Sequence, residues 1–221
     1  MKFLGYDSPI MSFLSRVADL FILNILTLIF SIPLITIGAA TTAAHYTALK
    51  MHREEGHVLS CFWKSFKMNF KQSTGIWFIF IAYSVISVVA YLFYGNMNNK
   101  ISSAFQGVLM ATLIFAAFLY AWVLPLQSRF VNTIGTTLKN AFYMAFRYFF
   151  RTLLMVVLNL LPVGTILCII FLLGLRGFPI WLLFGISVPI YWCAMLYDKI
   201  FEKLEEMIVD DSETETELEL E

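Results

Sequence analysis

The chain has 221 residues, of which 60% are apolar, and its mean hydropathy is +0.78. Soluble domains are roughly 45 to 50% apolar, so this composition excludes an ordinary soluble domain. The formal net charge is zero, but the charges are separated along the chain: between Leu20 and Tyr197 the acidic residues are Glu54 and Glu55, and most others follow Asp198. Three cysteines lie without metal or redox spacing, so the sequence predicts no disulfide framework.

Five apolar segments are long enough to cross a membrane as helices. A hydrocarbon core of about 30 Å needs about 20 helical residues. The segments that fit are residues 17–37, 75–94, 105–126, 153–175 and 178–197. Because hydrocarbon offers no hydrogen-bond partner to an open backbone, each segment is expected to be a helix. The sequence therefore predicts an all-α, polytopic transmembrane protein with a single domain over residues 1–207.

The first segment is followed by a loop in which residues 58–71 show helical periodicity. Aromatic side chains share one stripe and lysines cluster beside it; the residues are Phe62, Trp63, Phe66 and Phe70, with Lys64, Lys67 and Lys71. We predict an amphipathic interfacial helix, with its rings at the headgroup boundary and its lysines on anionic lipids. Each lysine would contribute on the order of 1 kcal/mol to the attraction to the membrane surface. The alternative is a coupling helix that docks onto a cytoplasmic partner.

The loop before the fourth segment carries a second basic strip. Lys139, Tyr143, Arg147 and Arg151 are spaced four residues apart, which places them on one helical face. Such strips lie at the membrane interface more often than in a binding site.

Polar residues and prolines within the segments indicate how the helices pack. Asn24 and Asn159 are expected to hydrogen-bond across helices. Pro162 and Pro189 predict kinks in the fourth and fifth helices. Asn24, Asn159 and Pro162 are thus candidates for helix packing or for lining a path. From residue 208 the chain is acidic and of low complexity, which predicts a disordered tail over residues 208–221.

The distribution of lysine and arginine predicts the orientation, because basic loops stay on the cytoplasmic side. These residues concentrate in the loops after the first and third segments, whereas the other two loops carry only Lys100 and Arg176. With five spans, this places the N-terminus outside and the C-terminus in the cytoplasm. If the first segment, which contains Pro33, re-enters instead of crossing, the N-terminus is cytoplasmic.

Motifs of conventional catalysis are absent from the sequence. It has no Gly-rich phosphate loop, nucleophile elbow or HExxH motif, so we predict no enzyme, no catalytic residues and no cofactor. His52 and Glu55 have a spacing compatible with metal binding, but no second ligand cluster accompanies them, so no metal site is predicted. The basic residues follow the membrane boundaries, which argues against nucleic-acid binding.

Several stretches carry a resemblance to a known family. They are residues 30–43 (FSIPLITIGAATTA), residues 62–72 (FWKSFKMNFKQ), and a second block formed by Asn140 and residues 151–159 (RTLLMVVLN). In these the chain resembles the YesL-like family, small bacterial membrane proteins, mostly of Gram-positive organisms, grouped under a domain of unknown function. The resemblance extends to about Glu206. Family members are often encoded beside binding-protein-dependent carbohydrate importers and glycoside-degrading enzymes, which implies a role in sugar uptake but no role for any residue.

We therefore predict a multi-pass protein of the bacterial plasma membrane that is a non-enzymatic accessory to carbohydrate uptake. Its cytoplasmic loops would contact a permease or ATPase subunit of a sugar importer. The alternative is a self-contained small solute carrier, homo-oligomeric as a dimer, in which Asn159 and the kinked last two helices line a path for a neutral solute.

Overall fold

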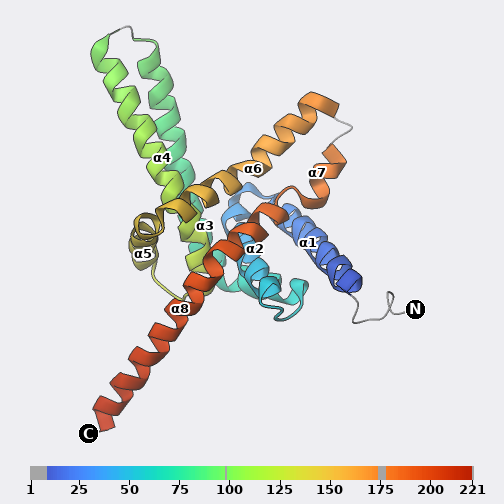
Figure 1. The fold of residues 1–221 in the computed structure, drawn as a ribbon. Coiled ribbons are helices and arrows are strands. Elements are labelled where there is room, and N and C mark those ends of the chain that lie inside the picture. Colours follow the sequence, from blue (N-terminus) through green and yellow to red (C-terminus); the bar gives the residue numbers. More distant parts are fainter. Residues whose placement is uncertain (1–8, 98, 174–177, 221) are drawn as a thin grey trace.

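The computed structural model describes residues 9–97, 99–173 and 178–220, and these form helices and no strand. The elements (Figure 1) are α1 (Pro9–Ser31), the 3-10 helix η1 (Leu34–Thr36), α2 (Ile37–His52), α3 (Val58–Gly95), α4 (Lys100–Arg129), α5 (Ile134–Arg147), α6 (Phe149–Leu173), α7 (Phe178–Phe184) and α8 (Ser187–Leu220).

Five helical segments are long and apolar enough to cross a membrane. They are Ile10–Ser31, Val58–Gly95, Lys100–Arg129, Phe149–Leu172 and Trp181–Met207. This confirms the all-α polytopic class predicted from the sequence. The end of the predicted fourth span, residues 174–175, lies outside the described residues.

Helix α2 lies at the centre of the fold, in contact with α1, α3, α4 and α8. Its buried face consists largely of glycine, alanine and threonine, which let neighbouring backbones approach closely. At Gly38 the approach is tightest: a Cβ there would lie 2.4 Å from the carbonyl oxygen of Ser73 in α3. The sequence placed most of these residues in a loop, so α2 is an element that the prediction missed.

Helix α1 ends earlier than the predicted first span. The span was placed at residues 17–37, but the helix ends at Ser31, and Pro33 begins a turn into η1. Proline disfavours a helical conformation for the residue before it, which explains the end. The chain then folds back, so that α1 and α2 pack against each other as a hairpin.

The two ends of this hairpin bear on the predicted orientation. Arg16, near the start of α1, forms an ion pair with Glu54 in the loop that follows α2. The start of α1 and the first basic loop therefore lie at the same end of the molecule. The five-span prediction put them on opposite sides of the membrane, whereas the alternative, in which the first segment re-enters, puts them on the same side. The orientation of the chain in the membrane stays a prediction.

The predicted interfacial helix over residues 58–71 is helical but is not a separate element. It forms the first part of α3, which has 38 residues without interruption, or about 57 Å at 1.5 Å per residue. The prediction of a distinct helix was wrong because no proline separates the basic stretch from the apolar one, and Gly75 alone does not break the helix.

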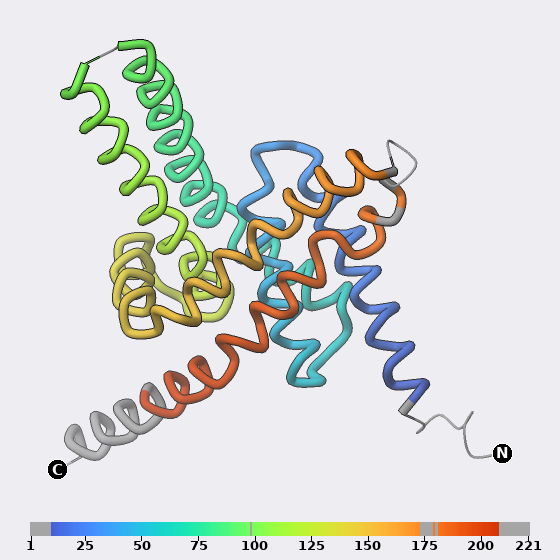
Figure 2. The backbone as a smooth tube through the Cα atoms, turned by 45° about the horizontal axis from the view of Figure 1, so that its top comes forward, coloured from blue at the N-terminus to red at the C-terminus, as the bar shows by residue number. Residues whose placement is uncertain are grey.

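The long helices leave the core in different directions. The hairpin of α3 and α4 and the helix α6 project on one side, while α8, where both views draw it in colour, leaves the core on another (Figures 1 and 2). Helix α8 continues to Leu220, and the disorder of residues 208–221 stays a prediction. The acidic segment contains no glycine or proline that would end a helix.

The predicted fifth span, residues 178–197, is broken between α7 and α8 at Gly185 and Ile186. Pro189 thereby falls in the first turn of α8, where its missing N–H needs no partner. The interruption in this region thus precedes the proline on which the predicted kink was based. Pro162 lies inside α6, which continues through it.

Candidate functional site

The aromatic stripe of residues 58–71 is divided between the protein core and the surface. Phe62 and Phe66 are buried against Phe30 of α1, with ring centroids 5.5 and 4.8 Å apart. Phe70 is partly buried and contacts Phe66 at 5.4 Å. These three rings therefore fasten α3 to the core, whereas the sequence predicted that they lie among lipid headgroups.

The rest of the surface of this part of α3 is exposed and basic. We call it the α3 basic face; its residues are Trp63, Lys64, Lys67, Met68 and Lys71. Trp63 lies at its edge, where its ring centroid is 5.5 Å from that of Phe30 and 6.0 Å from that of Phe66. The ammonium of Lys67 lies 4.5 Å from the ring centroid of Trp63, a cation–π contact. Among the ion pairs of the described residues, none includes the three lysines of this face. Their charges are available to an anionic partner.

An ion-pair cluster stands at the same end of the molecule as the first basic loop. Arg53 donates from Nε to Oδ1 of Asp198 at 2.7 Å and from Nη1 to Oε2 of Glu205 at 3.1 Å. Arg129 donates from Nε to Oε1 of Glu205 at 2.6 Å. The cluster joins the loop after α2, the end of α4 and the middle of α8.

The charges of this cluster are matched within the protein. Burial lowers the pKa of Arg53, but the hydrogen bonds to Asp198 and Glu205 outweigh burial, so that its pKa is raised above the ordinary value. Asp198 is also 3.4 Å from Nε2 of His52. Within the described residues no group of three potential ligands could hold a metal ion. The arrangement can lock three helices together.

Asn24, predicted as a packing or path-lining residue, is fully buried at the break between α7 and α8. Its Oδ1 accepts hydrogen bonds from the backbone N–H groups of Ile186 (2.8 Å) and Ser187 (2.9 Å). Its Nδ2 donates to the carbonyl of Leu182 at 2.6 Å. A broken helix exposes backbone groups that hydrocarbon cannot satisfy, and one side chain from α1 satisfies three of them.

Asn159 and Pro162, the other two candidates of this kind, lie in α6. Asn159 donates from Nδ2 to the carbonyl of Met155 in its own helix, at 2.9 Å, so this bond does not cross to another helix. The carbonyl of Pro162 accepts from Nε1 of Trp181 at 2.9 Å, which ties α6 to α7. Beside this contact, α6, α7 and α8 line an open apolar pocket of about 390 Å³.

The second basic strip lies on α5 and the start of α6. Lys139, Arg147 and Arg151 are exposed. Arg147 donates to the hydroxyl of Tyr143, and Arg151 donates to the carbonyl of Leu196 in α8 at 2.9 Å. Helix α5 is therefore a separate helix at the surface. The sequence predicted such a separate surface helix for residues 58–71 instead.

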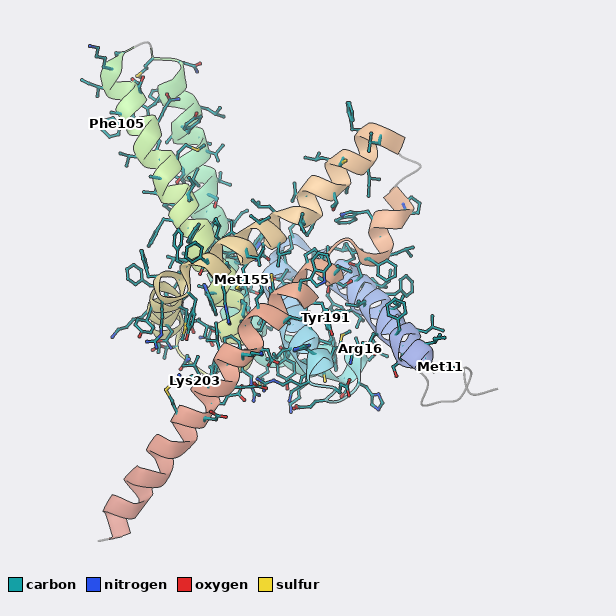
Figure 3. The ribbon with its side chains drawn as sticks, viewed as in Figure 1. Met11, Arg16, Phe105, Met155, Tyr191 and Lys203 are labelled. Carbon is teal, nitrogen blue, oxygen red and sulfur yellow. The ribbon has the colours of Figure 1, made fainter. Side chains whose placement is uncertain are left out.

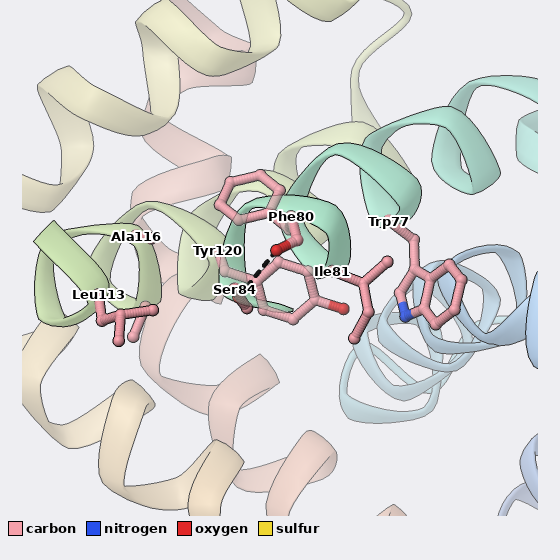
Figure 4. A pocket seen from close by; sticks show the side chains of 8 residues that line it. Trp77, Phe80, Ile81, Ser84, Leu113, Ala116 and Tyr120 are labelled. Carbon is pink, nitrogen blue, oxygen red and sulfur yellow. Dashed lines mark hydrogen bonds between the residues drawn. The ribbon is translucent and has the colours of Figure 1, made fainter. Parts of the chain in front are cut away.

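A groove between α3 and α4 is lined mainly by apolar side chains (Figure 4). Its volume is about 320 Å³, and the rings of Phe80 and Tyr120 meet there at 5.2 Å. The hydroxyl of Ser84 is engaged by the carbonyl of Phe80 at 2.8 Å. The groove can hold an apolar group, and its residues form no catalytic arrangement.

The sequence analysis missed the acidic half of the ion-pair cluster. Asp198 and Glu205 stand seven residues apart, a spacing that places them on one face of a helix. That spacing was a usable signal, but both residues were grouped with the acidic end of the chain.

A model of a protein family of unknown function, DUF624, matches residues 20–91. The match covers the second half of α1, all of α2 and most of α3, and therefore includes the Gly38 crossing and the α3 basic face. Comparison with curated proteins and with solved structures found no match.

Proposed function

We propose that this chain is a non-enzymatic accessory protein of the bacterial plasma membrane that binds a subunit of a carbohydrate importer through the α3 basic face. The observation that carries the proposal is the position of this face. It is exposed, its lysines have no acidic partner in the described part of the chain, and it lies on a helix much longer than a membrane crossing requires.

Helix α3 is long enough to contain both a membrane-crossing part, residues 75–94, and a part outside the membrane, residues 58–71. About 20 of its 38 residues suffice to cross a hydrocarbon core. If residues 75–94 cross, as their apolar composition indicates, residues 58–71 extend beyond the bilayer, together with the end of α1 whose Phe30 packs on Phe62 and Phe66. Their lysines favour the cytoplasmic side. Because Arg16 pairs with Glu54 at this end, the start of α1 is on the cytoplasmic side in the same orientation.

The α3 basic face is also held rigidly, as a docking surface requires. Behind it, Phe62 and Phe66 pack on Phe30. Such preorganisation reduces the entropic cost of association. A partner suited to this face presents acidic side chains around an apolar position that receives Trp63. The role in carbohydrate uptake rests on the family resemblance, and the match to an uncharacterised family is compatible with it.

Site-specific photocrosslinking in the native membrane tests this function. A photoreactive residue at Met68, on the basic face, is expected to capture a permease or ATPase subunit of a sugar importer. The same residue at Val108, which is exposed on the membrane-crossing part of α4, is the matched control and should capture lipid. Capture of lipid alone from Met68, together with unchanged sugar import after deletion of the gene, would refute the proposal.

The alternative of a self-contained carrier has one observation in its favour, the break between α7 and α8. Discontinuous helices form the substrate sites of many transporters. Here, however, the backbone groups of Leu182, Ile186 and Ser187 at the break already form hydrogen bonds with Asn24. Uptake of a labelled sugar by the purified protein in liposomes would support the carrier; absence of uptake in liposomes, with import in cells dependent on the chain, would support the accessory role.

A further inference from the structure

We propose that the groove between α5 and α8 is a binding site for an anionic phospholipid, with the headgroup phosphate held by Arg147 and Lys203 and an acyl chain lying along the aliphatic floor. This site is separate from the α3 basic face and does not depend on the proposed function.

The groove consists of two adjoining cavities of about 530 and 250 Å³. They share Tyr143, Met144 and Leu204, so together they form one elongated depression. One end is lined by the amides of Asn132 and Asn140. The other end is lined by Arg147, Tyr148, Ile200, Lys203 and Met207. Polar groups and cations thus surround a floor of methionine and aliphatic side chains, which is the division of chemistry found in a phospholipid.

Both cations are available for a phosphate. Among the ion pairs of the described residues, none includes Arg147 or Lys203. The guanidinium of Arg147 lies over the rings of Tyr143 and Tyr148, with centroid distances of 5.6 and 5.9 Å, and donates to the Tyr143 hydroxyl. Arginine has five N–H donors, so others remain for a phosphate oxygen.

The carboxylates near the groove do not neutralise it. Glu205 is engaged by Arg53 and Arg129. Glu202 and Glu206 are exposed on α8 and line neither cavity. Lys203 stands where α8 leaves the core (Figure 3). An anionic headgroup therefore meets two unpaired cations at the mouth of the groove.

The position of α5 puts the groove at the level of the headgroups. Phe142 and Phe146 of α5 pack on Phe115 of α4, with centroid distances of 6.0 and 6.2 Å. Phe115 is 15 residues after Lys100, or about 23 Å along the helix, on a segment that can span the membrane. The hydrocarbon core is about 30 Å thick. If Lys100, at the start of α4, lies at one boundary of this core, α5 lies near the opposite boundary.

The surroundings of α5 favour a lipid over a protein partner. Phe142, Phe146 and Phe150 are exposed, and Phe142 and Phe146 contact Phe115 of α4, which is exposed as well. Arginine and tyrosine beside exposed phenylalanine are typical of the membrane interface, where rings are immersed and cations meet phosphate. The same apolar environment that surrounds α4 therefore extends to the edge of the groove.

The test measures lipid binding to the full-length, delipidated protein in detergent by native mass spectrometry. Phosphatidylglycerol and phosphatidylcholine with identical acyl chains are the two probes. We expect preferential binding of phosphatidylglycerol, and a loss of at least about tenfold in its affinity in the double variant R147Q/K203Q, since each basic side chain contributes on the order of a fivefold effect. The conservative pair R147K/K203R should retain the preference.

A control variant separates this site from a general attraction of charge. K100Q removes an exposed cation at the start of α4, away from the groove, and should leave the preference for phosphatidylglycerol unchanged. An equal loss in K100Q, or unchanged binding in R147Q/K203Q, would overturn the proposal. Displacement of the lipid by millimolar inorganic phosphate would identify a free-phosphate site instead and would equally overturn it.

Discussion

The side-chain oxygen of Asn24 in α1 lies 2.9 Å from the backbone nitrogen of Ser187, the first residue of α8. Because the same oxygen also accepts from Ile186, and the amide nitrogen donates to Leu182, α1 holds the break in the fifth apolar segment in place. The break allows α7 to return from the end of α6 while α8 takes a new direction along the core.

Replacement of Asn24 with leucine should destabilise the fold by about 2–4 kcal/mol, because three buried backbone groups lose their partner. Leucine has a similar volume, so packing changes little. Asn159→Leu is the matched control, since within the described residues the Asn159 amide donates to a carbonyl of its own helix, and it should cost less than about 1 kcal/mol. Thermal unfolding in detergent measures both; equal effects would show that Asn24 has no special capping role.

Gly38 is expected to tolerate no side chain. In Gly38→Ala the new methyl group would lie 2.4 Å from the Ser73 carbonyl oxygen and 2.5 Å from Cβ of Trp77. Both neighbours are attached directly to the backbone, so α2 and α3 must separate, at about 1–3 kcal/mol. The same measurement on Gly164→Ala provides the comparison, because nothing lies within 4 Å of a Cβ there and alanine should be neutral or stabilising by up to about 1 kcal/mol. A stable G38A variant would contradict the tight crossing.

The ion-pair cluster should be sensitive to removal of one partner and less sensitive to removal of two. Arg53→Met leaves Asp198 buried without its main partner, which typically costs about 3–5 kcal/mol. The double variant R53M/D198L should recover part of this loss. Arg16→Met removes an exposed pair with Glu54 and should cost less than about 1 kcal/mol. A double-mutant cycle on the free energy of unfolding gives the coupling energy between Arg53 and Asp198. A coupling energy near zero would show that this ion pair does not stabilise the fold.

How far the sequence predicted this fold depended on the strength of the local pattern. The long apolar helices α3, α4 and α6 were evident because hydrophobicity alone defines them. Helix α2 was not evident: glycine, alanine and threonine cover it, and neither a continuous apolar run nor a simple stripe marks it. Its helical state depends on burial among four neighbours, which is a tertiary effect.

The candidate site was also predictable only where a local sequence pattern determines the position of a side chain. The exposure of Lys64, Lys67 and Arg147 follows from their charge, so their surface position was predictable. The burial of Phe62 and Phe66 was not, because an aromatic stripe has the same sequence pattern whether it faces lipid or Phe30. The role of Asn24 depends on a break more than 150 residues away in the chain, and no local pattern contains that information.

His45 in α2 gives the fold a predicted dependence on pH. Burial lowers its pKa to about 4 from 6.5. The Tyr197 hydroxyl donates to the His45 carbonyl at 3.2 Å and lies 3.3 Å from Nδ1. Protonation would therefore place a charge in the core.

The unfolded state takes up a proton near pH 6.5 and the folded state only near pH 4. The contribution of neutral His45 to stability is thus complete above pH 6.5 and is lost as the pH falls towards 4, at up to about 1.4 kcal/mol per pH unit. In His45→Gln, the unfolding temperature should fall less over this window than in the wild type. His57→Gln, at an exposed position, should keep the wild-type slope. A buried neutral imidazole takes up a proton on unfolding in this pH range. If the unfolding temperature changed with pH equally in H45Q and the wild type, His45 would not contribute to the acid sensitivity.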